Sequence, residues 1–134
     1  MRASPIYQKK MKVKNITIRI KSLEDVLKEA KGVMKNLDRG KPVKKHEGVS
    51  FASMDDMRKA LSEERLKILK TIRKEHPGSI YELAKILGRD KKNIFDDVRY
   101  LAQVGLIDLT KAKDGREKIT PRVNYERILL EIPV

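Results

Sequence analysis

Side chains that could carry out catalysis near neutral pH are scarce in this sequence. It contains two histidines and no cysteine. His46 lies in a lysine-rich stretch and His76 precedes Pro77-Gly78, so neither has the spacing of a Ser/His/Asp triad or of a metal site. Without cysteine there is no thiolate nucleophile, no disulfide and no thiolate metal ligand. Because glycine-rich phosphate loops and HExxH motifs are also absent, we expect no enzyme activity, no metal and no cofactor.

Charge is the second chemical feature of the sequence. Its 134 residues include 32 Lys and Arg against 19 Asp and Glu, which gives a net charge of +13. Residues 1–48 contribute +9 of this excess, whereas residues 78–109 are neutral. A strongly basic protein favours a polyanionic partner, with nucleic acid first and an anionic membrane or an acidic protein after it. A solvated, lysine-rich surface explains any single lysine equally well.

Hydropathy and composition indicate the compartment. No run approaches the roughly 18 apolar residues that a membrane-spanning helix needs. The first residues show no apolar segment of a secretory signal, so we expect a cytoplasmic protein. Charged residues make up 38% of the chain, mostly as Lys and Glu, a bias typical of the ion-pair-rich proteins of thermophiles.

The N-terminal third predicts an arm, a strand and a helix. Residues 1–14 have no apolar period and are expected to form a basic flexible arm. Asn15–Ile20 alternates apolar and polar residues, which predicts a half-buried strand. From Ser22 to Leu37, apolar residues recur at helical spacing, and this stripe suits burial in a protein core. We expect residues 15–48 to form a strand–helix extension that serves as a dimer or partner element.

Residues 49–134 contain four helix starts. Each is a Ser or Asp whose side chain can accept a hydrogen bond from the free backbone N–H groups of a first helical turn. They are Ser53, Ser62, Ser79 and Asp90. The last two helices are separated by Gly88, and the second of them ends at Gly105. Two helices joined by a short turn containing Gly predict a helix-turn-helix unit.

Short strands surround these helices. Val49–Ala52 precedes them, and Leu106–Leu109 follows as an apolar strand. Asp114-Gly115 is a favoured pair for a two-residue hairpin turn, from which Glu117–Thr120 returns. A hairpin directly after the second helix makes the unit a winged helix. The predicted fold is therefore α+β, a winged helix-turn-helix domain over residues 49–134 with an N-terminal strand–helix extension.

Two strands lack an obvious partner in a bare winged helix. Asn15–Ile20 and Glu126–Ile132 each have one apolar face. We expect them to pair with each other or across a two-fold homodimer. A dimer would place two recognition helices about one helical turn apart on palindromic DNA.

The stretch SIYELAKILGRDKKNIFDDVRYLAQVGLIDL, Ser79 to Leu109, resembles the DNA-reading unit of MarR-like winged-helix regulators. There a helix "-I-x-E-L-A-x-x-L-G" leads into a recognition helix that ends "-L-x-x-x-G-L-I". From about residue 15 onward, the chain is similar to a family of archaeal and bacterial MarR-like DNA-binding proteins. The matching parts are Ile16–Leu37, Ser50–Leu69 and Tyr125–Ile132.

The resemblance implies sequence-specific binding of double-stranded DNA by a transcriptional regulator. The recognition helix in the major groove would span roughly residues 90–104, and the wing would span roughly residues 106–120. Some members of the family look like antitoxins that neutralise a toxin encoded beside them. An antitoxin is therefore the first alternative, with a toxin or another acidic protein as partner. An RNA-binding or chromatin-type basic protein is the second, although six aromatic residues offer few platforms for stacking single-stranded bases.

Helical spacing selects the candidate DNA contacts. If Ile94, Val98 and Leu101 face inward, the polar side chains of the second helix face outward. Lys and Arg can donate to guanine, Asn can pair with adenine, and helix-start amides or wing cations can bind phosphates. The candidates are Ser79, Lys91, Lys92, Asn93, Phe95, Asp96 and Arg99 in the helices and Lys111, Lys113, Arg116 and Lys118 in the wing.

Several of these candidates have a second interpretation. Phe95 either contacts a thymine methyl group or packs against the first helix or a partner subunit. Asp96 either accepts from cytosine or keeps the surface soluble, whereas Asp97 pairs with a neighbouring Lys or Arg. Wing lysines are solvated charges in many hairpins. The helix over residues 22–37 lacks Trp and Phe, so we expect no membrane contact from it.

Overall fold

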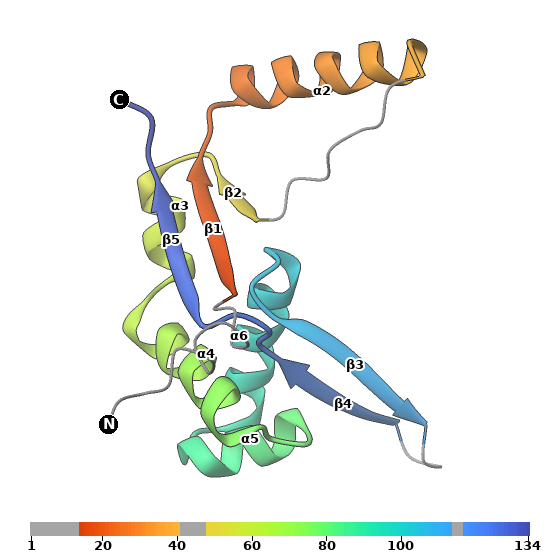
Figure 1. Cartoon of the computed structure of the whole chain (residues 1–134). Coiled ribbons are helices and arrows are strands. Elements are labelled where there is room, and N and C mark those ends of the chain that lie inside the picture. The colour runs from red at the N-terminus through yellow and green to blue at the C-terminus, as the bar shows by residue number, and fades with distance from the viewer. Residues whose placement is uncertain (1–13, 41–47, 114–116) are drawn as a thin grey trace, which may run out of the picture.

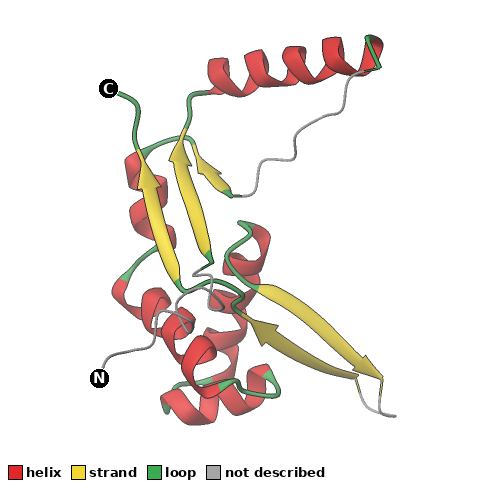
Figure 2. Cartoon of the chain, in the orientation of Figure 1, coloured by secondary structure: helices red, strands yellow, loops and turns green. Residues whose placement is uncertain are grey.

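The computed structural model describes residues 14–40, 48–113 and 117–134 (Figure 1). It is a mixed α+β fold, with its helices and strands coloured separately in Figure 2. The elements in chain order are β1 Asn15–Ile20, α2 Leu23–Asp38, β2 Val49–Phe51, α3 Met54–Ala60, α4 Glu63–Glu75, α5 Ile80–Leu87, α6 Lys91–Gln103, β3 Asp108–Lys113, β4 Glu117–Arg122 and β5 Arg127–Glu131. The expected arm before Lys14 and the expected turn at Asp114-Gly115 lie outside the described residues.

A three-stranded parallel sheet joins the two ends of the described chain. β1 lies in its centre, with β2 on one side and β5 on the other. Ile18 is opposite Val49 of β2 and Leu130 of β5, and it is fully buried. The prediction that the first and last strands pair with each other is therefore confirmed, and the pairing is formed within one chain. Arg19 Nε donates to the Glu131 carboxylate at 2.6 Å on the same pair of strands.

The helix starts are confirmed by their capping hydrogen bonds. The side chains of Ser53, Ser62, Ser79 and Asp90 each accept from the backbone N–H three residues further on. The N···O distances lie between 3.0 and 3.4 Å. Gly88 ends α5 in the left-handed conformation, with φ of 62°, which a residue with a Cβ rarely adopts. Local sequence thus fixes where each of these helices begins.

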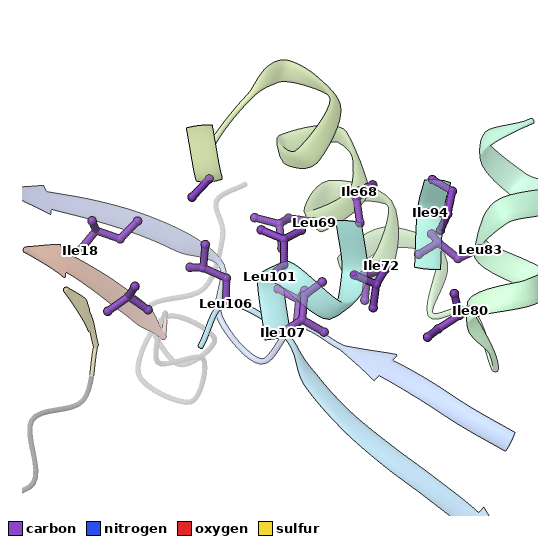
Figure 3. Packing of buried hydrophobic residues seen from close by; sticks show 14 of the residues in the cluster. Ile18, Ile68, Leu69, Ile72, Ile80, Leu83, Ile94, Leu101, Leu106 and Ile107 are labelled. Carbon is purple, nitrogen blue, oxygen red and sulfur yellow. The ribbon is translucent and has the colours of Figure 1, made fainter. Parts of the chain in front are cut away.

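One hydrophobic core connects the sheet to the helices (Figure 3). Ile68 and Ile72 of α4, Leu83 of α5 and Leu101 of α6 have almost no exposed surface. Ile18 of β1 belongs to the same buried cluster. Burying these aliphatic groups drives the packing, since each fully buried side chain contributes about 1.5–3 kcal/mol. β1 therefore shares its core with the helices that follow it.

The connection from α6 to the hairpin differs from the expectation. The predicted strand Leu106–Leu109 was wrong at its start, because β3 begins at Asp108. The backbone N–H groups of Leu106 and Ile107 instead donate to the carbonyl of Leu101, at 2.8 and 3.3 Å, and close the end of α6. Gly105, with φ of 95°, makes this reversal possible. The two residues are buried and anchor the hairpin to the helix.

Tyr125 strengthens this anchor. Its hydroxyl donates to the carbonyl of Leu106 at 2.8 Å. Burial, and to a lesser extent the charge of Asp108, raises the pKa of Tyr125 above its ordinary value. The hydroxyl therefore stays protonated and remains a donor.

α2 stands apart from the rest of the chain (Figure 1). Its apolar side chains Leu23, Val26, Leu27 and Met34 are exposed by between 45% and 73%. The stripe, whose pattern suits burial in a protein core, is therefore not buried against the described part of its own chain. Helical periodicity shows that one face of a helix is apolar, but it does not show which surface covers that face. Within the described residues, no helix is long and apolar enough to cross a membrane.

Gly48 offers a test of the parallel pairing. It has φ of 152°, and a Cβ there would lie 2.5 Å from the backbone oxygen of Thr17 in β1. We expect Gly48→Ala to lower the free energy of unfolding by about 2 kcal/mol or more, measured by thermal denaturation.

Gly32→Ala is the matched control for this substitution. Gly32 lies within α2, and a Cβ there meets nothing within 4 Å. This variant should raise helicity, since Ala is favoured over Gly by about 1 kcal/mol in a helix, and should leave the core transition unchanged. Equal losses of stability in both variants would contradict the proposed role of Gly48.

Candidate nucleic-acid interface

α5 and α6 form the centre of the candidate site. α6 buries Ile94, Val98 and Leu101, as the spacing predicts, and α5 buries Ile80 and Leu83. With one side of α6 held in the core, its opposite side faces solvent. The exposed residues there are Lys91, Lys92, Asn93, Phe95, Asp96, Arg99 and Gln103. The structure therefore brings together, on one helix, every candidate that the sequence placed between residues 91 and 99.

Asp97 is held inside the fold. Its carboxylate accepts from Arg65 Nε of α4 at 3.4 Å and from Arg89, in the turn before α6, at 3.3 Å. Its side chain is only 19% exposed. The prediction that Asp97 pairs with a neighbouring cation is confirmed. This arginine–carboxylate cluster ties α6 to the two elements before it.

The other acidic residues of the neutral stretch also have structural partners. Asp90 caps α6, and Glu82 accepts from the backbone N–H of Gly78 at 2.8 Å. Asp108 accepts from the Asn124 side chain at 2.7 Å. Asp96 is the remaining acid of the stretch, and it has no ion pair among the described residues. Four of the five acidic residues between residues 78 and 109 therefore serve the fold.

The cations of the same stretch are distributed differently. Arg89 is used in the cluster with Asp97, but Lys85, Lys91, Lys92 and Arg99 are exposed. The exposed side of α6 therefore carries Lys91, Lys92 and Arg99 against Asp96, while the exposed carboxylates of Glu82 and Asp90 lie at the two helix starts. Counting charges along the stretch missed this arrangement, because a count does not say on which side of a helix each charge lies.

Two aromatic side chains lie among these cations. The Lys91 ammonium is 3.7 Å from the ring centroid of Tyr81, and the Arg99 guanidinium is 5.7 Å from that of Phe95. Tyr81 and Phe95 are 44% and 37% exposed. Sequence reasoning selected Phe95 but missed Tyr81. The signal was present, because helical spacing that turns Ile80 and Leu83 inward turns Tyr81 outward.

Ser79 has a different position from the other candidates. Its hydroxyl accepts from the backbone N–H of Glu82 at 3.0 Å, and the Glu82 carboxylate takes the N–H of Gly78. Two amides that were expected to be available to a phosphate are therefore already bonded. A phosphate at this helix start would have to bind the N–H groups of Ile80 and Tyr81.

The hairpin of β3 and β4 supplies the remaining candidates. Lys111 and Lys118 are exposed, and the Lys118 ammonium lies against Gly78 at the start of α5. Thr120 Oγ1 donates to the Gly78 carbonyl at 2.7 Å, which docks the hairpin beside α5. Only the backbone of Lys113 is described, and Arg116 lies outside the described residues.

Comparison with known proteins adds one family. Residues 60–130, more than half of the chain, match the model of the family described as HVO_A0114. The chain belongs to the HVO_A0114 family. In this member the matching part extends from the end of α3 into β5, so it contains the α4–α6 helices and the hairpin, whereas β1, α2 and β2 precede it. No curated protein and no solved structure matches the chain.

The clustered carboxylate predicts unequal effects of two neighbouring substitutions. Asp97→Asn removes a charge that two arginines share in a partly buried site, so we expect a loss of about 1–3 kcal/mol in the free energy of unfolding. Asp96→Asn, on the exposed side, should change stability by less than about 0.5 kcal/mol. Urea unfolding of both variants measures this, and similar losses would show that the cluster does not orient α6.

Proposed function

We propose that this member of the HVO_A0114 family is a winged helix-turn-helix protein that binds double-stranded DNA sequence-specifically and without catalysis. α5 and α6 form the helix-turn-helix, with α6 as the recognition helix, and the β3–β4 hairpin forms the wing. A transcriptional regulator, as in the MarR-like proteins that the sequence resembles, is the role we infer. DNA is the polyanion that this arrangement of a helix and a hairpin fits best.

One observation carries the proposal: the buried side of α6 turns Lys91, Lys92 and Arg99 to solvent on one helix, while Asp97 is held by arginines inside the fold. Asp97 and Glu82 are bonded within the fold, whereas Lys91, Lys92 and Arg99 are exposed on α6. Along α6 itself, a phosphate backbone would meet these three cations beside one exposed carboxylate, that of Asp96. Such an arrangement attracts DNA without giving the whole unit a net charge.

The proposed contacts follow from the chemistry of each side chain. Lys91, Lys92 and Asn93 lie in the first turn of α6, which is the end of a recognition helix that approaches the base edges. Lys92 and Arg99 donate to guanine or to phosphate, and Asn93 pairs with adenine. Lys111 on the hairpin contacts phosphates and positions the duplex without reading it.

The same proposal includes a homodimer that uses α2. Since β1 and β5 pair within one chain, the apolar stripe of α2 is an exposed surface on which a partner can pack. By helical spacing, Glu24 and Lys31 border the stripe on one side and Glu29 borders it on the other, whereas Lys28 lies on the opposite face of the helix. A second copy of the chain offers the same apolar stripe with the same mixed charges beside it, so we infer that α2 of one copy packs on α2 of another.

The DNA proposal predicts two classes of variant. Lys92→Ala or Arg99→Ala, if in base contact, should weaken binding to the selected site by about 1–3 kcal/mol and spare non-specific binding. Lys111→Ala should instead weaken all duplexes alike and reduce the slope of log affinity against log salt by about 1. Fluorescence anisotropy with a duplex selected from a random library measures both effects.

Lys59→Ala is the control for these variants, because Lys59 is an exposed lysine of α3 outside the proposed interface. It should leave the affinity unchanged. A protein that prefers no duplex over heparin at near-physiological salt would refute sequence-specific binding.

The dimer is tested separately by light scattering. Leu27→Asp places a charge in the apolar stripe of α2, so the mass of the variant should fall to that of one chain. Lys28→Ala, on the face of α2 opposite the stripe, should keep the mass of the native protein. If the native protein has the mass of one chain at micromolar concentration, the dimer is contradicted. The proposal that the protein binds DNA is not affected by this result. A stable complex of the native monomer with an acidic protein would favour the antitoxin alternative.

A further inference from the structure

A shallow recess opens between the first turns of α5 and α6. It is lined by Ile80 and Tyr81 from α5 and by Lys91, Lys92 and Phe95 from α6. Its volume is about 410 Å³, and the atoms that face it are almost entirely apolar. Two of its lining residues are lysines, and the Lys91 ammonium lies 3.7 Å from the ring centroid of Tyr81. A ligand that fits must therefore present an apolar edge beside negative charge.

We propose that this recess reads the C5-methyl group of thymine in the major groove. The inference rests on the proposed function and deepens it, because it assigns a base to a site formed by two helices. Among the base edges of the major groove, thymine offers the one apolar group, and it lies within reach of the flanking phosphates. The apolar wall and the two lysines that line it match these two features.

The contacts around Tyr81 favour a methyl edge over a stacked base. The Lys91 ammonium lies 3.7 Å from the ring centroid and the Lys85 ammonium 5.0 Å from it. With its ring occupied by cations, Tyr81 is a poor platform for a base to stack on, as single-stranded nucleic acid would require. Phe95 is 37% exposed and its nearest cation, Arg99, is 5.7 Å from the ring centroid, so its ring offers apolar surface to a methyl group. The recess thus favours duplex DNA over an unpaired strand.

The fold does not need these two rings where they are. α6 buries Ile94, Val98 and Leu101, and α5 buries Ile80, Leu83 and Ala84, so the core is complete without Tyr81 and Phe95. Single exposed apolar residues are common on proteins. Here two aromatic rings and Ile80 line one recess on the side of α6 that carries Lys92 and Arg99, so a ligand-binding role explains their position.

The test uses the whole 134-residue chain and a duplex selected from a random library. Each thymine of the selected site is replaced in turn by uracil, which lacks the C5-methyl group and keeps the Watson–Crick pair. At one or two positions, we expect uracil to lower the affinity about fourfold. This factor corresponds to the free energy gained by burying one methyl group. Phe95→Ala should bind the thymine and uracil duplexes with equal affinity at those positions.

Ile86→Ala is the matched control. Ile86 is also an exposed apolar residue of α5, at 45%, but it does not line the recess, so this variant should keep the fourfold preference. Equal affinity of the native protein for thymine and uracil at every position, or a preference that survives in Phe95→Ala, would overturn the methyl assignment while leaving DNA binding in place. A selected site without thymine would do the same. If the protein binds no duplex at all, both the proposed function and the methyl assignment are overturned.

Discussion

The burial of one side of α6 is the constraint on which the rest of the site depends. Ile94, Val98 and Leu101 have no exposed surface, and they fix the rotation of the helix about its axis. Asp97 adds a polar restraint, because Arg65 and Arg89 hold its carboxylate from α4 and from the turn before α6. Once this rotation is fixed, Lys92, Phe95 and Arg99 have to face solvent together. The proposed DNA interface is therefore the complement of the core.

The positions of the charged side chains between residues 78 and 109 follow from the hydrogen-bonding needs of the helices. A helix start needs an acceptor for its free N–H groups, so Asp90 and the Ser79–Glu82 pair are used where they stand. The cations have no such local task, and their long side chains remain in water. A stretch with equal numbers of acids and bases thus presents three cations and one exposed carboxylate along α6. Net charge counted along a sequence conceals this arrangement, because it does not record where on the fold each charge lies.

The N-terminal third has two different relations to the fold. β1 is the central strand of the sheet, and Ile18 belongs to the common core, so this strand is part of the body of the protein. α2 follows directly but stands apart, with its apolar stripe in solvent (Figure 1). The matched family segment, residues 60–130, contains neither element. β1 completes a sheet that β5 alone could not form, whereas the apolar stripe of α2 is left exposed.

The sequence by itself determined the local structure. Ser53, Ser62, Ser79 and Asp90 mark the starts of four helices, and the inward face of α6 follows from the spacing of its aliphatic residues. These features depend on hydrogen bonds and side-chain directions within a few residues, so a local pattern is sufficient to predict them. The start of the hairpin was misplaced, because a buried pair such as Leu106-Ile107 suits a strand as well as a helix end.

Only the tertiary structure decided the relations between distant segments. It placed β1 between β2 and β5, moved Tyr81 beside Phe95, and left the stripe of α2 uncovered. It also brought Arg65, 32 residues away along the chain, into hydrogen-bond contact with Asp97. Hydrophobic periodicity gives the same signal whether a face is buried by its own chain or by another molecule. Which surfaces meet depends on the packing of the whole chain. The sequence therefore predicted which residues of a helix are apolar and inward-facing, but it did not predict which distant segments they pack against.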